Sequence, residues 1–330
     1  MKEASPEDYV QGVLTGDRRV LSKTITMIES ALDRHKDIAR AILDQLLPHA
    51  GGAVRLGITG VPGVGKSTFI ESLGMALIRQ GHKVAVLAVD PSSTRSGGSI
   101  MADKTRMEQL AVQTDAFIRP SPSGGTLGGV ARKTRESMLV CEAAGFDVMI
   151  VETVGVGQSE TAVASMVDFF LVLMLAGAGD ELQGIKKGVL ELADAIAITK
   201  ADGDNVDKAL QAARAYASAL HLLSPASAHW QPPVLTCSAV ALEGVDVVWQ
   251  TVLEHRQKMQ VSGEFDIKRR GQALDWLRAL VDDGLRERFL RHPKIRQHFS
   301  RYQRDVARGD TSPTIAAQEL LFFLDNPKSP

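Results

Sequence analysis

Residues 60–67, Gly-Val-Pro-Gly-Val-Gly-Lys-Ser, fit the pattern G-x-x-x-x-G-K-[ST] and constrain the fold of this chain more than any other stretch. The apolar run at residues 54–59 predicts a buried strand before them, and residues 68–78 predict a helix that stops before Gly81. A strand, a glycine-rich loop and a helix in this order form a phosphate-binding P-loop. The sequence therefore predicts an α/β fold that binds a nucleoside triphosphate.

The predicted loop supplies several kinds of contact to a phosphate chain. Its glycines allow backbone N–H groups to turn inward, and the helix N-terminus behind them favours anions. Lys66 would reach the β- and γ-phosphates, and the Ser67 hydroxyl would ligate Mg²⁺. The residues expected to hold the nucleotide phosphates are Gly63, Val64, Gly65, Lys66, Ser67 and Thr68.

Short apolar runs alternate with helical segments through the middle of the chain. Continuous apolar strands separated by helices predict a mainly parallel sheet that helices cover on both faces. In such sheets, ligands gather at the carboxyl ends of the strands. Polar residues, among them Asp90 and Glu152, follow several of the runs. The expected strands after residues 54–59 are 84–89, 148–151, 169–175, 195–198 and 234–237, and the expected helices between them include 133–144, 181–192 and 206–222.

Both ends of the chain show helical rather than strand periodicity. Residues 1–50 carry apolar positions at helical spacing and predict a small helical arm, and the nucleotide domain is expected at 51–256. Residues 257–330 predict appended helices, because Leu274 and Leu277 begin a series of apolar residues near helical spacing. This apolar face could mediate self-association or pack within the chain, and the pattern alone favours neither.

Composition excludes some partners and compartments. The 38 Lys and Arg residues nearly balance 39 Asp and Glu, which argues against a nucleic acid or a membrane surface as the main partner. Cys141 and Cys237 lie in apolar stretches, and the eight His residues show no ligand spacing, so buried thiols fit better than a disulfide or a structural metal site. The N-terminus lacks an apolar signal region and no run is long enough to span a bilayer, so we expect a cytoplasmic protein.

The segment Thr199-Lys200-Ala201-Asp202 indicates which nucleotide is bound, because it follows an apolar run and fits the guanine-reading pattern [NT]-K-x-D. The Asp202 carboxylate can accept hydrogen bonds from guanine N1–H and N2–H₂ together, whereas adenine has no such donor pair on that edge. Lys200 would lie along the base, and Ser238-Ala239 could place a backbone N–H on guanine O6. K-x-D alone is equally typical of a solvated strand end, but in combination with the P-loop it favours GTP.

Carboxylates at strand ends are the predicted magnesium and hydrolysis residues, because phosphoryl transfer needs Mg²⁺ held directly or through water by such groups. Glu152 ends a predicted strand and is soon followed by Gly155, whose N–H could meet the γ-phosphate. Asp90 and Asp103 are further candidates for the metal shell or for orienting water, although Asp103 could instead cap the helix that follows it. Val156 cannot orient a water as the Gln of Ras-like GTPases does, so we expect slow hydrolysis that a partner or a rearranged loop accelerates.

Three glycine-rich segments, at residues 91–98, 121–129 and 177–188, are expected to be moving parts of the site. Small residues permit large backbone changes, and contacts to a γ-phosphate can order such loops until hydrolysis releases them. Lys186 or Lys187 could reach a nucleotide phosphate, but a solvated charge at a helix start is an equally good interpretation.

Together these segments resemble the MeaB/ArgK family of GTPases, the chaperones of adenosylcobalamin-dependent acyl-CoA mutases such as methylmalonyl-CoA mutase. The likeness covers residues 50–256 densely and both ends loosely. The runs that carry it are GITGVPGVGKST at 57–68, AVDPSS at 88–93, GGSI at 97–100, DKTRM at 103–107, FIRP at 117–120, VETVGVGQSE at 151–160 and GDELQGIKKG at 179–188.

The resemblance implies a SIMIBI-class P-loop domain with a helical N-terminal arm and a C-terminal dimerisation element. Such proteins couple GTP binding and hydrolysis to loading, protection or reactivation of the B12 cofactor on the mutase. Residues 177–188 match the family's mutase-responsive switch, with Lys186 contributing to activated hydrolysis. The family usually has Asn where Thr199 stands, so we expect altered nucleotide affinity without loss of guanine specificity. The positions that match the family's phosphate and Mg²⁺ residues are Lys66, Ser67, Asp90, Asp103 and Glu152.

Three other functions fit parts of the sequence. A nucleotide-dependent kinase or transport-associated ATPase would transfer phosphate to a protein or an amino acid, but Lys200 and Asp202 argue against ATP. A GTP-driven metallochaperone would need a Cys/His cluster, and a P-loop protein without turnover would leave the carboxylates at 90, 103 and 152 without a role. The sequence therefore favours a GTP-hydrolysing mutase chaperone, without naming the acyl-CoA on which the mutase acts.

Overall fold

A computed structural model describes residues 5–30, 32–89, 107–120, 127–153, 159–177, 187–221 and 227–325. The chain forms two compact units, Met1–Gln272 and Ala273–Pro330. The division expected from the sequence, at residues 50 and 256, remains a prediction.

The first unit is built on one sheet of seven strands within the described residues, in the order β3-β2-β4-β1-β5-β6-β7. All neighbouring strands are parallel, so the predicted α/β sheet is confirmed, and it is wholly rather than mainly parallel. The strand β3 was not expected from the sequence. The strands are β1 (Val54–Gly60), β2 (Val84–Val89), β3 (Ala116–Arg119), β4 (Val148–Thr153), β5 (Phe169–Leu175), β6 (Ala195–Thr199) and β7 (Val234–Thr236).

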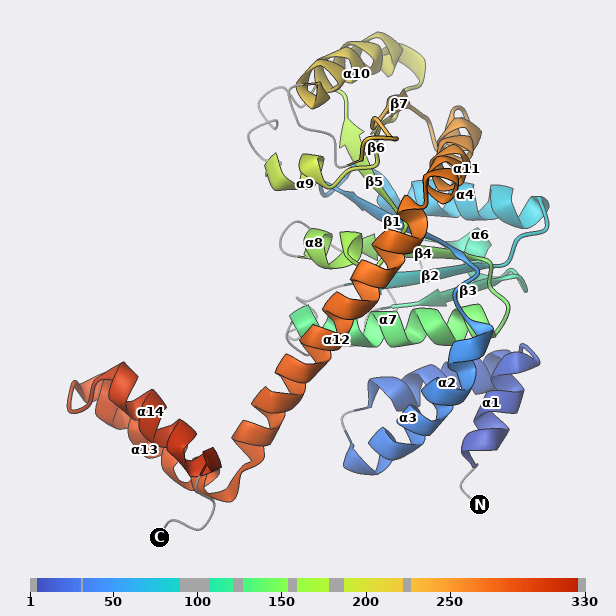
Figure 1. Ribbon diagram of the computed structural model, residues 1–330. Coiled ribbons are helices and arrows are strands. Elements are labelled where there is room, and N and C mark those ends of the chain that lie inside the picture. Colours follow the sequence, from blue (N-terminus) through green and yellow to red (C-terminus); the bar gives the residue numbers. More distant parts are fainter. Residues whose placement is uncertain are drawn as a thin grey trace. The chain divides into compact units, whose positions relative to one another are not determined.

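Helices cover both faces of this sheet, as Figure 1 shows. On one face, α4 (Lys66–Arg79) packs on β1, whose Leu56 and Ile58 belong to the core there, and α11 (Val245–Ser262) packs on α4 and β5. On the other face lie α7 (Leu127–Ala143) and α8 (Ser159–Ala164). Successive side chains of a strand point to opposite faces, and Gly57 lies on the face of β1 that α8 covers. A Cβ atom at Gly57 would come within 2.9 Å of Val163 and Val167, so only glycine allows this close packing.

Several expected helices have different limits in the structure. The helix expected at 133–144 begins earlier, at Leu127, so residues 127–129 of the expected moving segment form its first turn. That this segment moves stays a prediction. Other elements of the first unit among the described residues are the short η1 (Leu47–His49), α6 (Glu108–Ala111), α9 (Lys187–Glu191) and η4 (Gly203–Asn205), and the longer helix α10 (Val206–Leu220).

Residues 5–46 form three helices that pack against α7, namely α1 (Pro6–Leu14), α2 (Arg18–Glu29) and α3 (Asp33–Leu46). A capping box between Ser5 and Asp8 starts α1 by satisfying backbone N–H groups at its N-terminus. Leu21, Ile25 and Ile42 are buried at the centre of this arm. The helical periodicity of the N-terminal residues therefore reflects a packed apolar face.

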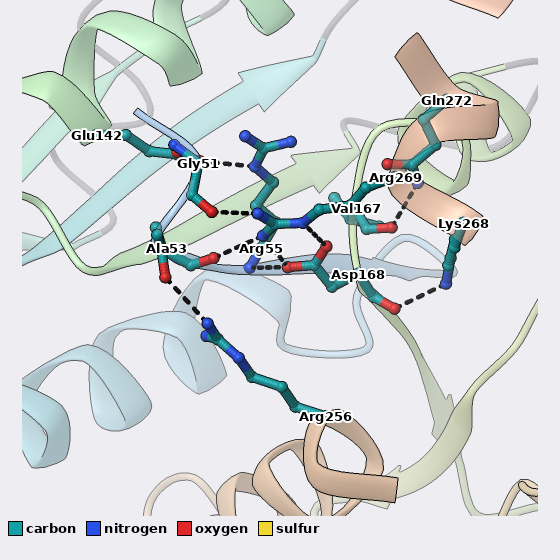
Figure 2. A network of polar contacts seen from close by, with 11 residues as sticks. Gly51, Ala53, Arg55, Glu142, Val167, Asp168, Arg256, Lys268, Arg269 and Gln272 are labelled. Atoms are coloured by element: carbon teal, nitrogen blue, oxygen red, sulfur yellow. Dashed lines mark hydrogen bonds and ion pairs between the residues drawn. The ribbon is translucent and has the colours of Figure 1, made fainter. Parts of the chain in front are cut away.

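A network of polar contacts holds the start of α12 (Glu264–Arg291) against the amino ends of β1 and β5 (Figure 2). The Arg269 guanidinium donates to both carboxylate oxygens of Asp168, from Nε at 2.8 Å and from Nη2 at 2.7 Å. It also donates to the carbonyl oxygens of Gly51 and Ala53. The backbone N–H of Arg55 donates to the same Asp168 carboxylate at 3.0 Å. A buried carboxylate is thus shared by a strand start and a helix start.

The contacts around this pair extend the network. Arg55 Nε donates to Glu142 on α7 at 2.6 Å, and Glu142 also accepts from the Gly51 backbone. Lys268 donates to the Asp168 carbonyl at 2.7 Å, and Gln272 donates to the Val167 carbonyl at 2.8 Å. This network lies at the amino edge of the sheet, opposite the edge that carries the P-loop.

The second unit contains the part of α12 from Ala273 onward, α13 (Pro293–Arg308) and α14 (Pro313–Asp325). Ile295 of α13 and Leu320 of α14 are buried, and His298 stacks on Phe323 with ring centroids 5.3 Å apart. In the described part of the chain, no helix has both the length and the apolar character needed to cross a membrane.

Candidate nucleotide-binding site

The P-loop connects the end of β1 to the start of α4. Gly63 and Gly65 have φ angles of 80° and 94°, the left-handed region that glycine enters without a steric cost. Gly65 is the N-cap residue of α4, and Val64 between the two glycines is fully buried. The loop therefore has the glycine-dependent turn expected from the sequence, and it ends at a helix N-terminus.

Lys66 lies across this loop. Its Nζ donates to the carbonyl oxygen of Gly60 at 2.7 Å and approaches that of Val61 at 3.4 Å. An ammonium group has three N–H donors, so it can contact loop carbonyls and a phosphate oxygen at the same time. Ser67 and Thr68 follow in the first turn of α4 and are not buried.

Glu152 lies on the face of the sheet that α4 covers. It is in register with Ile58 of β1 and Ala88 of β2, and its side chain is on the same face as the core residue Ile150. It is only 5% exposed. Since α4 covers that face and begins with Lys66 and Ser67, Glu152 and the Ser67 hydroxyl lie at the same edge of the sheet. Both side chains offer oxygen atoms, the kind of ligand that Mg²⁺ prefers.

Other predicted residues lie outside the described part of the chain. These are Asp90, Asp103, Gly155, Val156 and Lys186, together with residues 91–98, 121–126 and 178–186 of the expected moving segments. Among the described residues, no group of three or more His, Cys, Asp and Glu side chains could hold a metal ion. The complete set of Mg²⁺ ligands therefore remains a prediction.

Thr199, at the end of β6, contacts the P-loop directly. Its hydroxyl lies 2.7 Å from the Val64 carbonyl oxygen and 3.2 Å from that of Met174 on β5. Thr199 is 2% exposed, so water does not compete for this hydrogen bond. Thr199 thus ties the start of the predicted base-reading segment to the P-loop.

The base-reading segment after Thr199 is held in a tight turn. Lys200 has a φ of 56°, which is unusual for a residue with a side chain. The Asn205 side chain donates to the Lys200 carbonyl at 2.7 Å, and the Ala201 N–H donates to the Cys237 carbonyl at 3.1 Å. These two hydrogen bonds compensate for the strained backbone, so the exposed Lys200 and the half-buried Asp202 are presented at the carboxyl edge of the sheet.

The Ser238-Ala239 loop completes this side of the site. The Ser238 hydroxyl donates to Asp202 and accepts from the Ala241 N–H, while the Ser72 hydroxyl on α4 donates to the Ala239 carbonyl at 2.8 Å. The Ser238 backbone N–H donates to Glu243. The sequence offered the backbone N–H groups of Ser238 and Ala239 as donors to guanine O6. Only the Ala239 N–H has no hydrogen-bond partner among the described residues.

Burial keeps Cys237, directly before this loop, in its neutral form. Desolvation raises the pKa of the thiol to about 12. A neutral thiol is a poor nucleophile and a poor metal ligand. Cys237 therefore contributes packing to the site rather than chemistry.

The structure thus brings together the P-loop, Glu152, Thr199, Lys200, Asp202, Ser238 and Ala239. Sequence reasoning missed Ser72 and Asn205. Asn205 lies three residues beyond Asp202, where a turn-forming Asn is common, so a local signal for it was present. Ser72 showed no signal, since it is one polar residue in an ordinary helix and its partner is 167 residues away.

We predict that Thr199→Val lowers GDP affinity about tenfold, because a free-energy loss near 1.4 kcal/mol is typical for removing one buried hydrogen-bond donor. Valine keeps the shape of threonine but cannot donate to Val64. Isothermal titration calorimetry with GDP measures the effect. Thr199→Ser is the matched control and should bind GDP as the unchanged protein does. Equal GDP affinity in Thr199→Val and the unchanged protein would show that the contact does not position the loop.

Comparison with known proteins agrees with this geometry. The family model described as "Methylmalonyl Co-A mutase-associated GTPase MeaB" matches residues 21–294. A probable GTPase of Mycobacterium tuberculosis is 54% identical over 325 residues, which cover 97% of each chain. The mouse (Mus musculus) protein named methylmalonic aciduria type A homolog, mitochondrial, is 45% identical over 320 residues, covering 94% of this chain and 77% of the mouse protein.

A solved structure described as a LAO/AO transport system kinase has a TM-score of 0.76 and 40% sequence identity to this chain. The match covers 98% of this chain and 99% of that one. These matches span the whole nucleotide-binding unit, and the similarity expected from the motif runs is confirmed. The chain belongs to the MeaB family of methylmalonyl-CoA mutase-associated GTPases, and it is a P-loop GTPase.

Proposed function

We propose that this GTPase is a chaperone of an adenosylcobalamin-dependent acyl-CoA mutase of the methylmalonyl-CoA mutase type. In this role, GTP binding and hydrolysis are coupled to loading, protection or reactivation of the mutase cofactor. The observation that carries the proposal is the match of residues 21–294 to a family described by its association with that mutase. The name of the mouse relative, which refers to methylmalonic aciduria, supports it.

The residues of the site are proposed to act in two groups. On the phosphate side, Lys66 contacts the β- and γ-phosphates, and Ser67 and Glu152, with Asp90 and Asp103, hold Mg²⁺ and orient water. When bound, Mg²⁺ neutralises the charge that develops on the phosphate oxygens.

On the base side, Asp202 accepts hydrogen bonds from guanine, Lys200 lies along the ring, and the Ala239 backbone N–H donates to O6. The Ser238 hydroxyl orients Asp202, because both are already hydrogen-bonded in the structure.

We expect slow GTP hydrolysis by the isolated protein and faster hydrolysis with the mutase, because Val156 cannot orient water and Lys186 lies in the segment proposed to respond to the partner. Steady-state hydrolysis of GTP and ATP, with and without a purified acyl-CoA mutase encoded nearby in the genome, measures both. Lys186→Ala should lose the stimulation. Lys208→Ala, an exposed lysine on α10, is the control and should keep it.

The outcomes of this experiment separate the candidate functions. Mutase-stimulated turnover of GTP alone supports the chaperone role. Stimulation that survives Lys186→Ala would remove Lys186 from the proposed switch and leave the chaperone role intact. Equal use of ATP without any effect of the mutase would contradict the proposal.

A second candidate is a nucleotide-dependent kinase or ATPase associated with amino-acid transport. The description of the solved structure that is 40% identical to this chain favours it. Such a function requires transfer of the γ-phosphate to an amino acid or a protein, rather than to water. Incubation with γ-labelled GTP and ATP, followed by a search for labelled acceptor, distinguishes transfer from hydrolysis.

We further propose that the chain forms a homodimer through α12. Leu274, Leu277, Val281 and Leu285 recur every three or four residues on this helix, and each is more than half exposed. A continuous apolar stripe of this kind is costly to leave in water and is typical of helix pairing between subunits. The two interpretations left open by the sequence, self-association and packing within the chain, are thereby weighted toward self-association.

A further inference from the structure

The second unit carries a strong local positive charge. Residues 286–308 contain eight Lys or Arg residues and two acidic residues, whereas the whole chain has 38 basic and 39 acidic residues. The remainder of the chain is therefore net negative. Seven of the eight basic residues are arginines. The charge is thus concentrated around the end of α12 and along α13.

Packing in the second unit determines where these charges point. One side of α13 is covered by α14, with Ile295 buried and His298 stacked on Phe323. Figure 1 shows the two helices side by side. At about 100° per residue, Arg304 lies about 180° around the helix from Ile295. Arg296 and Arg308 are also exposed, and we call these three arginines the basic face of α13.

The charges of the basic face are not compensated within the described part of the chain. The two acidic residues of this stretch are already engaged, Glu287 with Arg291 at 2.8 Å and Asp305 with Arg301 at 3.4 Å. Among the described residues, none of the three guanidinium groups of the basic face has an ion-pair or hydrogen-bond partner. Solvent can screen such charges, but like charges close together repel each other and favour binding of an opposite charge.

The surroundings of the basic face favour an acidic protein surface over a membrane or a nucleic acid. Insertion of α13 into a bilayer needs an accessible apolar side, and α14 covers that side. The chain as a whole has 38 basic and 39 acidic residues, a balance that argues against a nucleic acid as its main partner. Arginine presents a planar fork that pairs with carboxylates in a bidentate manner, which suits Asp and Glu side chains on a folded partner.

We propose that the basic face of α13 docks on an acidic surface of the mutase. This inference rests on the proposed chaperone function and assigns a contact surface to it. Complementary charge mainly accelerates association and makes binding depend on ionic strength. The basic face should therefore set the association rate with the mutase, while the nucleotide site acts independently of it.

The test compares two triple charge reversals with equal change of net charge. The first, Arg296→Glu/Arg304→Glu/Arg308→Glu, reverses the basic face. The matched control, Arg40→Glu/Arg79→Glu/Arg214→Glu, reverses exposed arginines on α3, α4 and α10. Association with the purified mutase is followed by surface plasmon resonance at several salt concentrations. Reversal of the basic face should slow association about tenfold or more and flatten its salt dependence. The control should associate as the unchanged protein does, and both variants should keep the basal GTP hydrolysis rate.

The possible failures can be told apart. If the mutase binds the unchanged protein and both variants equally, the inference is wrong and the chaperone function stands. If the mutase neither binds nor stimulates the unchanged protein, the chaperone function is wrong and the inference falls with it. Circular dichroism checks that the reversed helices remain folded, and Arg296→Gln/Arg304→Gln/Arg308→Gln should show a smaller loss in the same direction. Tighter binding of a DNA duplex or of phosphatidylserine vesicles than of the mutase, lost on reversal of the basic face, would also overturn the inference.

Discussion

Arg269→Ala is expected to lower the free energy of unfolding by about 3–5 kcal/mol, the usual cost of breaking a buried ion pair by removing one partner. Asp168 is 4% exposed and accepts two hydrogen bonds from the Arg269 guanidinium. Without Arg269 its negative charge would remain buried, with the Arg55 backbone N–H as its remaining donor among the described residues. The carbonyl oxygens of Gly51 and Ala53 would lose the same guanidinium.

The charge state of Arg269 supports this size of effect. Burial alone would lower the pKa of the guanidinium, but the hydrogen bonds and the negative charge of Asp168 outweigh burial and raise it. Arg269 is therefore charged at any accessible pH, and its loss removes a full positive charge from the network. Arg269→Lys keeps the positive charge but loses the planar, two-pronged guanidinium. It should therefore lower the free energy of unfolding, but by less than Arg269→Ala does.

Urea unfolding followed by circular dichroism measures this prediction. The matched control is Arg270→Ala, which removes the neighbouring arginine. Arg270 is exposed, and among the described residues its side chain donates only to the Asp266 carbonyl of its own helix. Arg270→Ala should change the unfolding free energy by no more than about 0.5 kcal/mol. Similar losses in the two variants would mean that the network does not anchor α12.

Lys66→Ala is expected to reduce kcat/KM for GTP hydrolysis by about 10²–10³, the range found when one preorganised donor to a developing negative charge is removed. Lys66 is the one lysine of the P-loop, at the first position of α4, and its Nζ already lies on the loop carbonyls. Alanine cannot reach a phosphate oxygen, and the backbone N–H groups of the loop would have to carry the phosphate charge alone.

Single-turnover and steady-state hydrolysis separate the two contributions of Lys66. A higher KM with an unchanged kcat would mean that the lysine acts in substrate binding. Equal decreases in kcat and kcat/KM would mean that its contact is made in the transition state. Lys83→Ala, at an exposed lysine before β2, is the control and should hydrolyse GTP at the unchanged rate. Wild-type turnover by Lys66→Ala would remove the P-loop lysine from the mechanism.

Most strands could be predicted because burial on both faces makes them continuous apolar runs. The runs at 84–89 and 169–175 coincide with β2 and β5. The strand β3 was missed because it has four residues, ends in Arg119 and pairs only with β2 at the edge of the sheet. A short edge strand does not need a long apolar run, so its sequence resembles a loop.

In the candidate nucleotide-binding site, too, the local features could be predicted from the sequence and the long-range contacts could not. Gly63, Gly65 and Lys66 could be assigned from the sequence because the P-loop is a local structure whose turns depend on its own residues. The contacts of Thr199 with Val64 and of Ser72 with Ala239 join residues 135 and 167 positions apart. Local patterns carry no information on such pairs, so these positioning contacts could be seen only in the folded chain.

The sequence by itself determined the P-loop and the parallel strands around it, and it predicted a guanine-reading segment after one of them, because each of those parts is encoded in consecutive residues. Only the tertiary structure decided the strand order, the tie between Thr199 and the P-loop, and the anchoring of α12 by Arg269 on Asp168, 101 residues earlier. Those features depend on which distant segments meet when apolar faces are buried, and that choice is made by the packing of the whole chain.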